Sequence, residues 1–586
     1  MRLKNILPAL CMALSLPVGA QEYMEYGMYS DNTAAYIPVS DIDSITYGDH
    51  PELEDNVVGV LARNPKASIF YAALVETGMA DSLRTNLFDD GFKHTVAPGW
   101  LNWHYYGTPY TERENRQNKF TVFAETDEAY KANGINSLSD LKAYAAKVYD
   151  EVYPDDAAVK DPTDRRNSLN RFVSYHLLDR YVKLSTEKVL KQFVSTVQDM
   201  ACWHETLMPH SLLKCSYPTG SEEGWYVNRR GVQDRADARG VKVRGAMVST
   251  ADSAQTAFNG ICYYIDEIIT YGKKTQQVVL DERMRMDAMT LSPDFMNSAV
   301  AADIIEDLYG DIHSFDAYAP GTTKNIESNG NIYVTPGYLS WWDYLGNEVA
   351  IIAESFSAVR IKLPPVPEGT YEVRLGFTNT EGRKQVAMLD ADLLEYDDAG
   401  NPILGGEGNV VVIDDVFSSI ISDAEVTSYN YETMLDSYVS DERLAELNAM
   451  TETNRNRALA RQGLSIKWWE WFYTLSEEAR VALATRRISM TDEERIADED
   501  KLLHGRGWMK GPASYLHTDP SYGMTLRSEK QVKRRVVGQF QSDGKTDHYL
   551  TIREGTNRNY GELHFDYIEL CPKSVYDNPA VPEDQY

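Results

Sequence analysis

Cysteine is scarce in this sequence, and its scarcity limits what can hold the fold together. Only 5 cysteines occur among 586 residues. Small exported domains that lack a sufficient core depend on dense disulfide bridges, so a disulfide scaffold of that kind is excluded. A chain of this length can bury hydrophobic cores of its own, and we expect two or more domains.

Several sequence motifs that carry chemistry are also missing. The chain has neither of the glycine-rich phosphate loops, GxGxxG and GxxxxGK[ST], and it has no HExxH, CxxC or GxSxG. These motifs supply phosphate cradles, metal ligands and activated nucleophiles. We therefore expect no catalytic residues, no cofactor and no metal, although a triad defined by geometry alone stays open.

Basic residues are few relative to acidic ones. The chain has 58 Lys and Arg against 88 Asp and Glu, which gives a formal net charge of −30. Nucleic acids and anionic membranes are bound through basic patches, so we expect no nucleic-acid partner. A neutral ligand such as a glycan, or a surface protein, is compatible with this charge.

Long hydrophobic runs are absent except at the N-terminus, where "MRLKNILPALCMALSLPVGAQEY" begins with two basic residues. The apolar run ends in a small-residue pattern at Ala20, which predicts a signal peptide over residues 1–20. The run is too short to span a bilayer. A lipid anchor at Cys11 is disfavoured, because Leu10 precedes the cysteine at a position where lipid-anchor signals have a small residue. We expect export to the periplasm or the outer-membrane surface and a mature net charge of −32.

Four cysteines remain after cleavage, at Cys202, Cys215, Cys262 and Cys571. The sequence does not assign their pairing. Two of them bound "CWHETLMPHSLLKC", which also holds two histidines. This spacing fits no standard zinc site, so an extended segment with partly buried cysteines is the better interpretation.

The first half of the chain mixes strand and helix patterns. In "KFTVFAETDEAY" an apolar run predicts a buried strand, and Thr126 followed by two acids predicts the start of a helix that ends at Asn133-Gly134. Ser137 with Asp140 predicts a second helix start.

From about residue 325 the pattern changes to short alternating strands. "AVRIKLPPVPEGTYEVRLGFTN" predicts a hairpin, and so does the stretch around Asp543-Gly544. Strands at this spacing predict a β-sandwich. Helical patterns over about 430–515 predict an insert within it.

Three boxes resemble the fasciclin domain family. "TVFAETDEAY" is similar to its first box, T-V-F-A-P-T-x-x-A-F, with Glu125 in place of proline. Tyr175-His176 in "SYHLL" is similar to its Tyr-His box, and "NGICYYID" to its N-G-x-I-H-x-I-D box, with Tyr263 in place of histidine. The boxes occur in the family's order and cover about residues 56–272.

The resemblance implies that the first box is a structural joint and not a catalytic centre. It implies a fold-supporting role for His176 and, more distantly, an adhesion role for Tyr175 and His176. "GTYEVRLGFTN", "RGWMKGPASY" and "HFDYIELCP" resemble the C-terminal sandwich beside fasciclin domains in exported proteins of Bacteroidota-type bacteria, which is similar to a galactose-binding jelly roll.

The resulting fold prediction is an α+β fasciclin-like domain followed by an all-β jelly-roll-like sandwich with a helical insert. The predicted parts are a signal peptide (1–20), an extension (21–55), the fasciclin-like domain with polar inserts (56–272), a helical linker (273–324), the sandwich (325–575) and a tail (576–586).

Clusters of aromatic residues are the candidate ligand sites. Trp341, Trp342 and Tyr344 lie in "YLSWWDY", where flat rings at a loop can stack on sugar faces. The alternative is that these rings belong to the core. We expect a non-enzymatic exported protein for adhesion or glycan-associated binding. The alternatives are a carbohydrate-active enzyme with an unrecognised carboxylate pair, and a structural surface component that binds another protein.

Overall fold

The structure is a computed structural model. It describes residues 23–28, 33–38, 54–84, 110–111, 118–184, 200–218, 222, 224–249, 254–297, 313–315, 323–328, 331–336, 347–353, 358–377, 385–390, 410–413, 441–451, 454–455, 476, 508–510, 533–554 and 561–581. The chain divides into two compact units, residues 1–53 and 54–586. In the first, β1 (Tyr23–Met28) pairs antiparallel with β2 (Thr33–Pro38).

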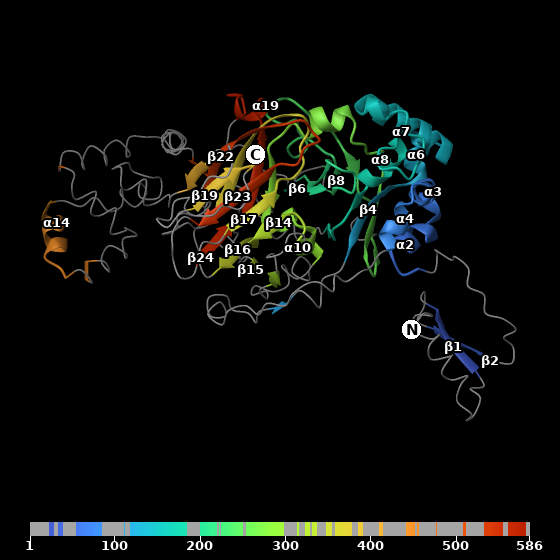
Figure 1. Ribbon diagram of the computed structural model, residues 1–586, viewed down its shortest axis with the longest axis horizontal. Helices are drawn as coiled ribbons and strands as arrows, with labels where there is room; N and C mark the ends of the chain where they lie inside the picture. The colour runs from blue at the N-terminus through green and yellow to red at the C-terminus, as the bar shows by residue number, and fades with distance from the viewer. Residues whose placement is uncertain are drawn as a thin grey trace. The chain divides into compact units, whose positions relative to one another are not determined.

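Helices of the second unit gather around a small mixed sheet (Figure 1). The sheet has the order β10-β11-β4-β5, and its central pair, β11 with β4, is parallel. Its strands are β4 (Phe120–Glu125), β5 (Leu177–Leu178), β10 (Gln255–Ala257) and β11 (Gly260–Ile265). The helices are α2 (Val57–Arg63), α3 (Ser68–Glu76), α4 (Met79–Arg84), α6 (Asp127–Ala132), α7 (Leu138–Val152) and α8 (Ser168–Tyr175).

Local signals explain how these elements begin. The Thr126 hydroxyl accepts a hydrogen bond from the Ala129 amide at 3.2 Å and caps α6, and the Ser137 hydroxyl caps α7 through Asp140 at the same distance. Both predicted helix starts are therefore confirmed. Gly260 is required where β11 passes β4, because a side-chain Cβ there would collide with the Phe120 carbonyl oxygen.

A second, antiparallel sheet follows in the sequence, with the order β6-β7-β8-β9. Its strands are β6 (Met200–Glu205), β7 (Leu212–Tyr217), β8 (Tyr226–Val227) and β9 (Ala246–Met247). The predicted extended segment around Cys202 and Cys215 is thus the β6–β7 hairpin, in which both cysteines are buried.

Two five-stranded antiparallel sheets combine strands from distant parts of the chain. One has the order β12-β25-β18-β22-β21: β12 (Met284–Asp287), β18 (Gly369–Phe377), β21 (Trp508–Lys510), β22 (Lys533–Ser542) and β25 (Tyr567–Pro572). The other has the order β14-β17-β23-β19-β20: β14 (Ile326–Ser328), β17 (Ala358–Lys362), β19 (Gln385–Leu389), β20 (Val410–Ile413) and β23 (Tyr549–Glu554).

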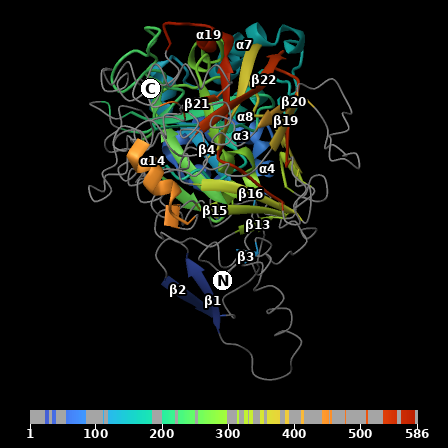
Figure 2. The same ribbon diagram turned by 90° about the vertical axis from the view of Figure 1, so that its left-hand side faces the viewer.

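The last sheet has the order β24-β16-β15-β13-β3, and Figure 2 shows β13, β15 and β16 as neighbours. Its strands are β3 (Tyr110–Thr111), β13 (His313–Phe315), β15 (Asn331–Pro336), β16 (Asn347–Ala353) and β24 (Gly561–Phe565). Short helical pieces complete the described chain: η3 (Pro65–Ala67), η5 (Pro154–Asp156), η7 (Thr275–Val279), η8 (Ala288–Leu291), α10 (Pro293–Asn297), α14 (Asp441–Asn448) and α19 (Lys573–Tyr576).

The predicted fold class, a fasciclin-like domain followed by a jelly-roll-like sandwich, is wrong. Four of the five sheets in the second unit, all except the mixed sheet, are small and essentially antiparallel, and they are arranged like a four-bladed β-propeller, with helices mixed in. Sequence patterns mark strands but not their partners: β12, from the predicted linker, pairs with β25 near the C-terminus. One hydrophobic core cluster includes both Val57 and Leu570. The predicted domain boundaries stay predictions.

Both predicted hairpins are also wrong, although their strands exist. β17 and β18 lie in different sheets, and so do β22 and β23. Gly544 adopts a left-handed conformation, φ 71°, as the turn signal requires. The turn reverses the chain, but the following strand pairs with another sheet. Of the predicted insert over about 430–515, the described residues show α14 as their main element.

Candidate functional site

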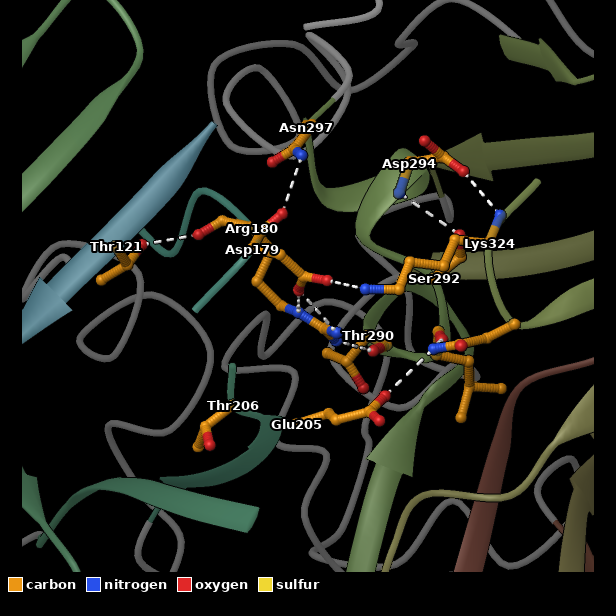
Figure 3. Close-up of polar contacts among 12 residues, drawn as sticks. Thr121, Asp179, Arg180, Glu205, Thr206, Thr290, Ser292, Asp294, Asn297 and Lys324 are labelled. Atoms are coloured by element: carbon orange, nitrogen blue, oxygen red, sulfur yellow. Dashed lines mark hydrogen bonds and ion pairs between the residues drawn. The ribbon is translucent and has the colours of Figure 1, made fainter. Parts of the chain in front are cut away.

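A polar cluster forms where the ends of β5 and β6 meet the segment from η8 to α10 and the start of β14 (Figure 3). We call it the polar junction. Its side chains are Asp179, Arg180, Glu205, Asp294, Asn297, Lys324 and Asn325. These residues come from four separate segments, so the fold and not a sequence motif brings them together.

Asp179 is the anion at the centre of the polar junction. It accepts a hydrogen bond from Arg180 Nε at 3.1 Å and forms an ion pair with Lys324. Burial alone would raise the pKa of Asp179, but the charges of Arg180 and Lys324 outweigh this effect and lower it. Asp179 is therefore held as a carboxylate, which can accept hydrogen bonds but has no proton to give.

Arg180 is buried and fixes the orientation of this centre. Its Nη1 donates to the Thr290 carbonyl oxygen at 2.6 Å, and its own carbonyl oxygen accepts from the Thr121 hydroxyl at 2.7 Å. Asn297 donates to the Asp179 carbonyl oxygen at 3.0 Å. These bonds connect β4, η8 and α10, and they leave the arginine little freedom to rearrange around a ligand.

Glu205 links the polar junction to a second set of charges. One carboxylate oxygen accepts from Asn325 at 3.2 Å, and the other lies 3.1 Å from Lys362 Nζ. The same ammonium lies 3.3 Å from a carboxylate oxygen of Asp547. Burial would lower the pKa of Lys362, but Glu205 and Asp547 outweigh burial and raise it. Lys362 is thus a cation held between two carboxylates.

His210 is a partly exposed neighbour of Asp547. Its Nδ1 lies 3.5 Å from the Asp547 carboxylate, and its side chain is 32% exposed. His210 occupies the turn between β6 and β7 in a left-handed conformation with φ 56°. Such a conformation is uncommon for a residue other than glycine and is held here by the surrounding turn. We infer that the turn aims the ring at Asp547.

The predicted Tyr-His box lies inside the helical part of the molecule. Tyr175 and His176 are both fully buried. His176 Nε2 lies 2.6 Å from Glu125 Oε1, and its Nδ1 lies 2.7 Å from the Phe172 carbonyl oxygen. The Tyr175 hydroxyl donates to the Leu212 carbonyl oxygen at 3.0 Å. The adhesion role of this pair stays a prediction, because these contacts do not test it.

Glu125, which stands where the fasciclin box has proline, is a further buried acid. It accepts hydrogen bonds from the Tyr130 hydroxyl at 2.8 Å and from the Ile269 amide at 3.2 Å, in addition to the contact with His176. Burial, and then the nearby Glu125 charge, raise the pKa of Tyr130 well above its ordinary value. This cluster joins β4, α6 and α8 in the core.

The other predicted ligand residues, Trp341, Trp342 and Tyr344, lie outside the described residues. In the stretch from Cys202 to Cys215, the structure brings the two cysteines together and places His210 apart at the turn. Among the residues that the structure describes, no group of three or more His, Cys, Asp or Glu is placed to hold a metal ion.

Sequence reasoning missed the main residues of the polar junction and its extension. Lys324 and Asp547 stand in unremarkable polar stretches, Lys362 lies at the end of a predicted strand, and no spacing connects them with Glu205. Only their tertiary neighbours single them out.

In the part of the chain that the structure describes, no helix is both long and apolar enough to cross a membrane.

No protein-family model matches the sequence, and no curated protein matches it.

Proposed function

We propose that the chain is a non-enzymatic, exported binding protein for adhesion or glycan-associated binding. The proposal that the chain is not an enzyme rests on the position of Lys362. Its ammonium lies 3.1 Å from Glu205 and 3.3 Å from Asp547. A carboxylate pair that hydrolyses a glycoside needs the space between its members for the scissile bond or a water molecule. Here Lys362 occupies the space between Glu205 and Asp547, so this pair is not arranged for glycoside hydrolysis.

The direction of the pKa shifts that some described acids show supports the same proposal. Glycoside hydrolysis needs one carboxyl that keeps its proton near neutral pH, which requires a raised pKa. Among the described Asp and Glu residues with a shifted pKa, the shift is downward, as it is for Asp179 and Glu569. Their cationic partners favour the ionised form. Such acids are suited to holding structure together.

The proposed partner is a neutral glycan or a surface protein. The net charge of −30 opposes polyanions and leaves neutral ligands available. The predicted glycan contact is the aromatic run with Trp341 and Trp342. Stacking of a sugar on each ring would contribute on the order of 1 kcal/mol to the binding free energy. Export rests on the basic start and on the small-residue pattern that ends at Ala20.

A glycan array probed with the mature chain, residues 21–586, tests this proposal, followed by calorimetry on any glycan that binds. Trp341→Ala and Trp342→Ala should weaken binding and leave the melting temperature unchanged. Trp468→Ala, in the separate run "KWWEWF", is the matched control and should retain binding. If both Trp341→Ala and Trp342→Ala bind normally but melt earlier, the pair is structural and the proposed contact is wrong.

A further inference from the structure

We infer that Cys202 and Cys215 are built to form a disulfide across the β6–β7 hairpin when the chain meets a small disulfide oxidant such as oxidised glutathione. The two residues are direct partners in the antiparallel register, Cys202 opposite Cys215. Direct partners project their side chains from the same face of a sheet. Both are present as thiols in the structure. The inference is separate from the proposed binding function.

The backbone already places this pair at a distance that a disulfide can bridge. Opposed residues in an antiparallel pair have Cα atoms about 4.5 to 5.5 Å apart. Disulfides accept Cα separations of about 4.4 to 6.8 Å. The register therefore meets the Cα condition. Bond formation also needs new side-chain rotamers and a small approach of the two Cβ atoms, which lie about 4.5 to 5.5 Å apart in opposed residues and about 3.5 to 4.5 Å apart in a disulfide.

The Cys202 thiol contacts Cys215 in the reduced hairpin. The Cys202 sulfur lies 3.7 Å from the Cys215 carbonyl oxygen, to which its thiol donates. A hydrogen bond to the Cys202 thiol is the largest cause of the raised pKa of Cys215, followed by burial. Both observations place the Cys202 sulfur beside Cys215, as a bond between the two sulfurs requires.

The other two cysteines of the mature chain are not arranged in this way. Cys262 lies on β11, where its thiol donates to the Val57 carbonyl oxygen at 3.7 Å. Cys571 lies on β25, in a different sheet. The hairpin pair is therefore the one that the register of the sheets selects among the pairings that sequence leaves open.

The reaction is two successive thiol–disulfide exchanges. One cysteine thiolate attacks oxidised glutathione, forms a mixed disulfide and releases one reduced glutathione. The second thiolate attacks the cysteine sulfur of the mixed disulfide and releases the second glutathione. Two cysteine thiols are oxidised, one glutathione disulfide is reduced, and the two protons end on the two glutathione thiols.

The burial of the pair decides which sulfur reacts first and when. Cys202 is 8% exposed and Cys215 is fully buried, so Cys202 is the residue that an external disulfide reaches. Exchange needs a thiolate, and the hydrogen bond with the Cys202 thiol, followed by burial, holds the pKa of Cys215 above its ordinary value. We therefore expect the bond to form while the hairpin is folding, and only slowly in the folded protein.

Refolding the denatured, reduced mature chain in a glutathione redox buffer tests the inference. Remaining thiols are blocked with an alkylating agent, and the peptides are mapped by mass spectrometry without reduction. We expect one linked peptide pair that joins Cys202 to Cys215, with Cys262 and Cys571 alkylated. Alkylation of both hairpin cysteines in a correctly refolded chain, or a bond from either one to Cys262 or Cys571, would overturn it.

A stability measurement provides an independent readout. The oxidised wild-type chain should melt at a higher temperature than the same chain in a reducing buffer. This difference should disappear in the double variant Cys202→Ser, Cys215→Ser and persist in the matched control Cys262→Ser, Cys571→Ser. A difference that persists in the hairpin variant would assign the redox effect to other residues and contradict the inference. The peptide map uses the wild-type chain, so it remains decisive if a variant fails to fold.

Discussion

Arg285 Nη2 lies 2.6 Å from the Glu569 carboxylate, although the two residues are 284 positions apart in the sequence. They are direct partners in the pairing of β12 with β25. Glu569 also accepts hydrogen bonds from Arg374 at 2.9 Å and from Arg534 at 2.7 Å, and it is fully buried. One carboxylate therefore joins four strands of one sheet, β12, β18, β22 and β25.

Replacing Glu569 with Gln should destabilise the protein by about 3–5 kcal/mol, the usual cost of removing one partner from a buried ion pair. Glutamine has a similar shape but no charge, so three buried guanidinium groups lose their common anion. Chemical denaturation measures the change. Asp577→Asn is the matched control, because the Asp577 side chain is 61% exposed and its ion pair with Lys573 is on the surface. Equal stability of the two variants would contradict the prediction.

Acidification should lower the unfolding free energy of the wild-type protein, and Glu569 should account for part of this loss. Burial opposes the ionisation of Glu569, but its arginine partners outweigh burial and hold its pKa well below the ordinary value of 4.5. As the pH falls, the unfolded chain therefore binds a proton at Glu569 before the folded chain does. The contribution of Glu569 to the unfolding free energy is complete above the ordinary pKa of 4.5 and decreases as the pH drops below it. Asp179, whose pKa is also lowered, acts in the same direction.

Denaturation curves recorded between about pH 5 and about pH 3 check this pH dependence. The loss of unfolding free energy should be steep in the wild type and shallower in Glu569→Gln, which has no carboxyl at this position to titrate. Parallel pH profiles for the two proteins would show that Glu569 is not the residue responsible.

His176→Ala should lower stability by about 1–3 kcal/mol, because it leaves the buried Glu125 carboxylate without one of its hydrogen-bond partners. His176 contacts Glu125 at 2.6 Å in a fully buried position. Thermal melting is the measurement. His210→Ala is the control, since His210 is partly exposed and makes a longer contact of 3.5 Å with Asp547. An unchanged melting temperature together with loss of ligand binding would assign His176 a functional role instead.

Cleavage after Ala20 should give a mature protein that begins at Gln21. The physical basis is a basic start, an apolar run and a small-residue site that a signal peptidase recognises. Mass spectrometry of the protein purified from its native host measures the terminus. A lipid-modified Cys11 as the first residue, or a retained Met1, would contradict this prediction.

Local chemistry could be predicted from the sequence where one segment contains all the interacting residues. Thr126 and Ser137 cap their own helices, and "TVFAE" forms a fully buried strand. Pairing between distant strands could not be predicted, because it depends on which hydrophobic faces pack together in the folded chain. The Asp543-Gly544 signal shows this limit: it marks a real turn, but β22 and β23 join different sheets.

The polar junction could not be predicted from the sequence for the same reason. Asp179 and Lys324 are 145 positions apart, and Glu205 and Lys362 are 157 positions apart. Each is an ordinary charged residue in its own segment. A charged residue becomes informative only when burial and a specific partner are known, as for Arg374, which lies in a predicted strand but is fully buried against Glu569.

Analysis of oligosaccharide products determines whether this chain binds glycans without cleaving them. The mature chain and the Glu205→Gln variant are incubated with the glycans that the array identifies, and the products are separated by chromatography. We expect both proteins to return every oligosaccharide intact. Release of shorter sugars by the wild type, abolished in Glu205→Gln while the variant keeps its fold, would contradict it and establish a carboxylate-dependent enzyme.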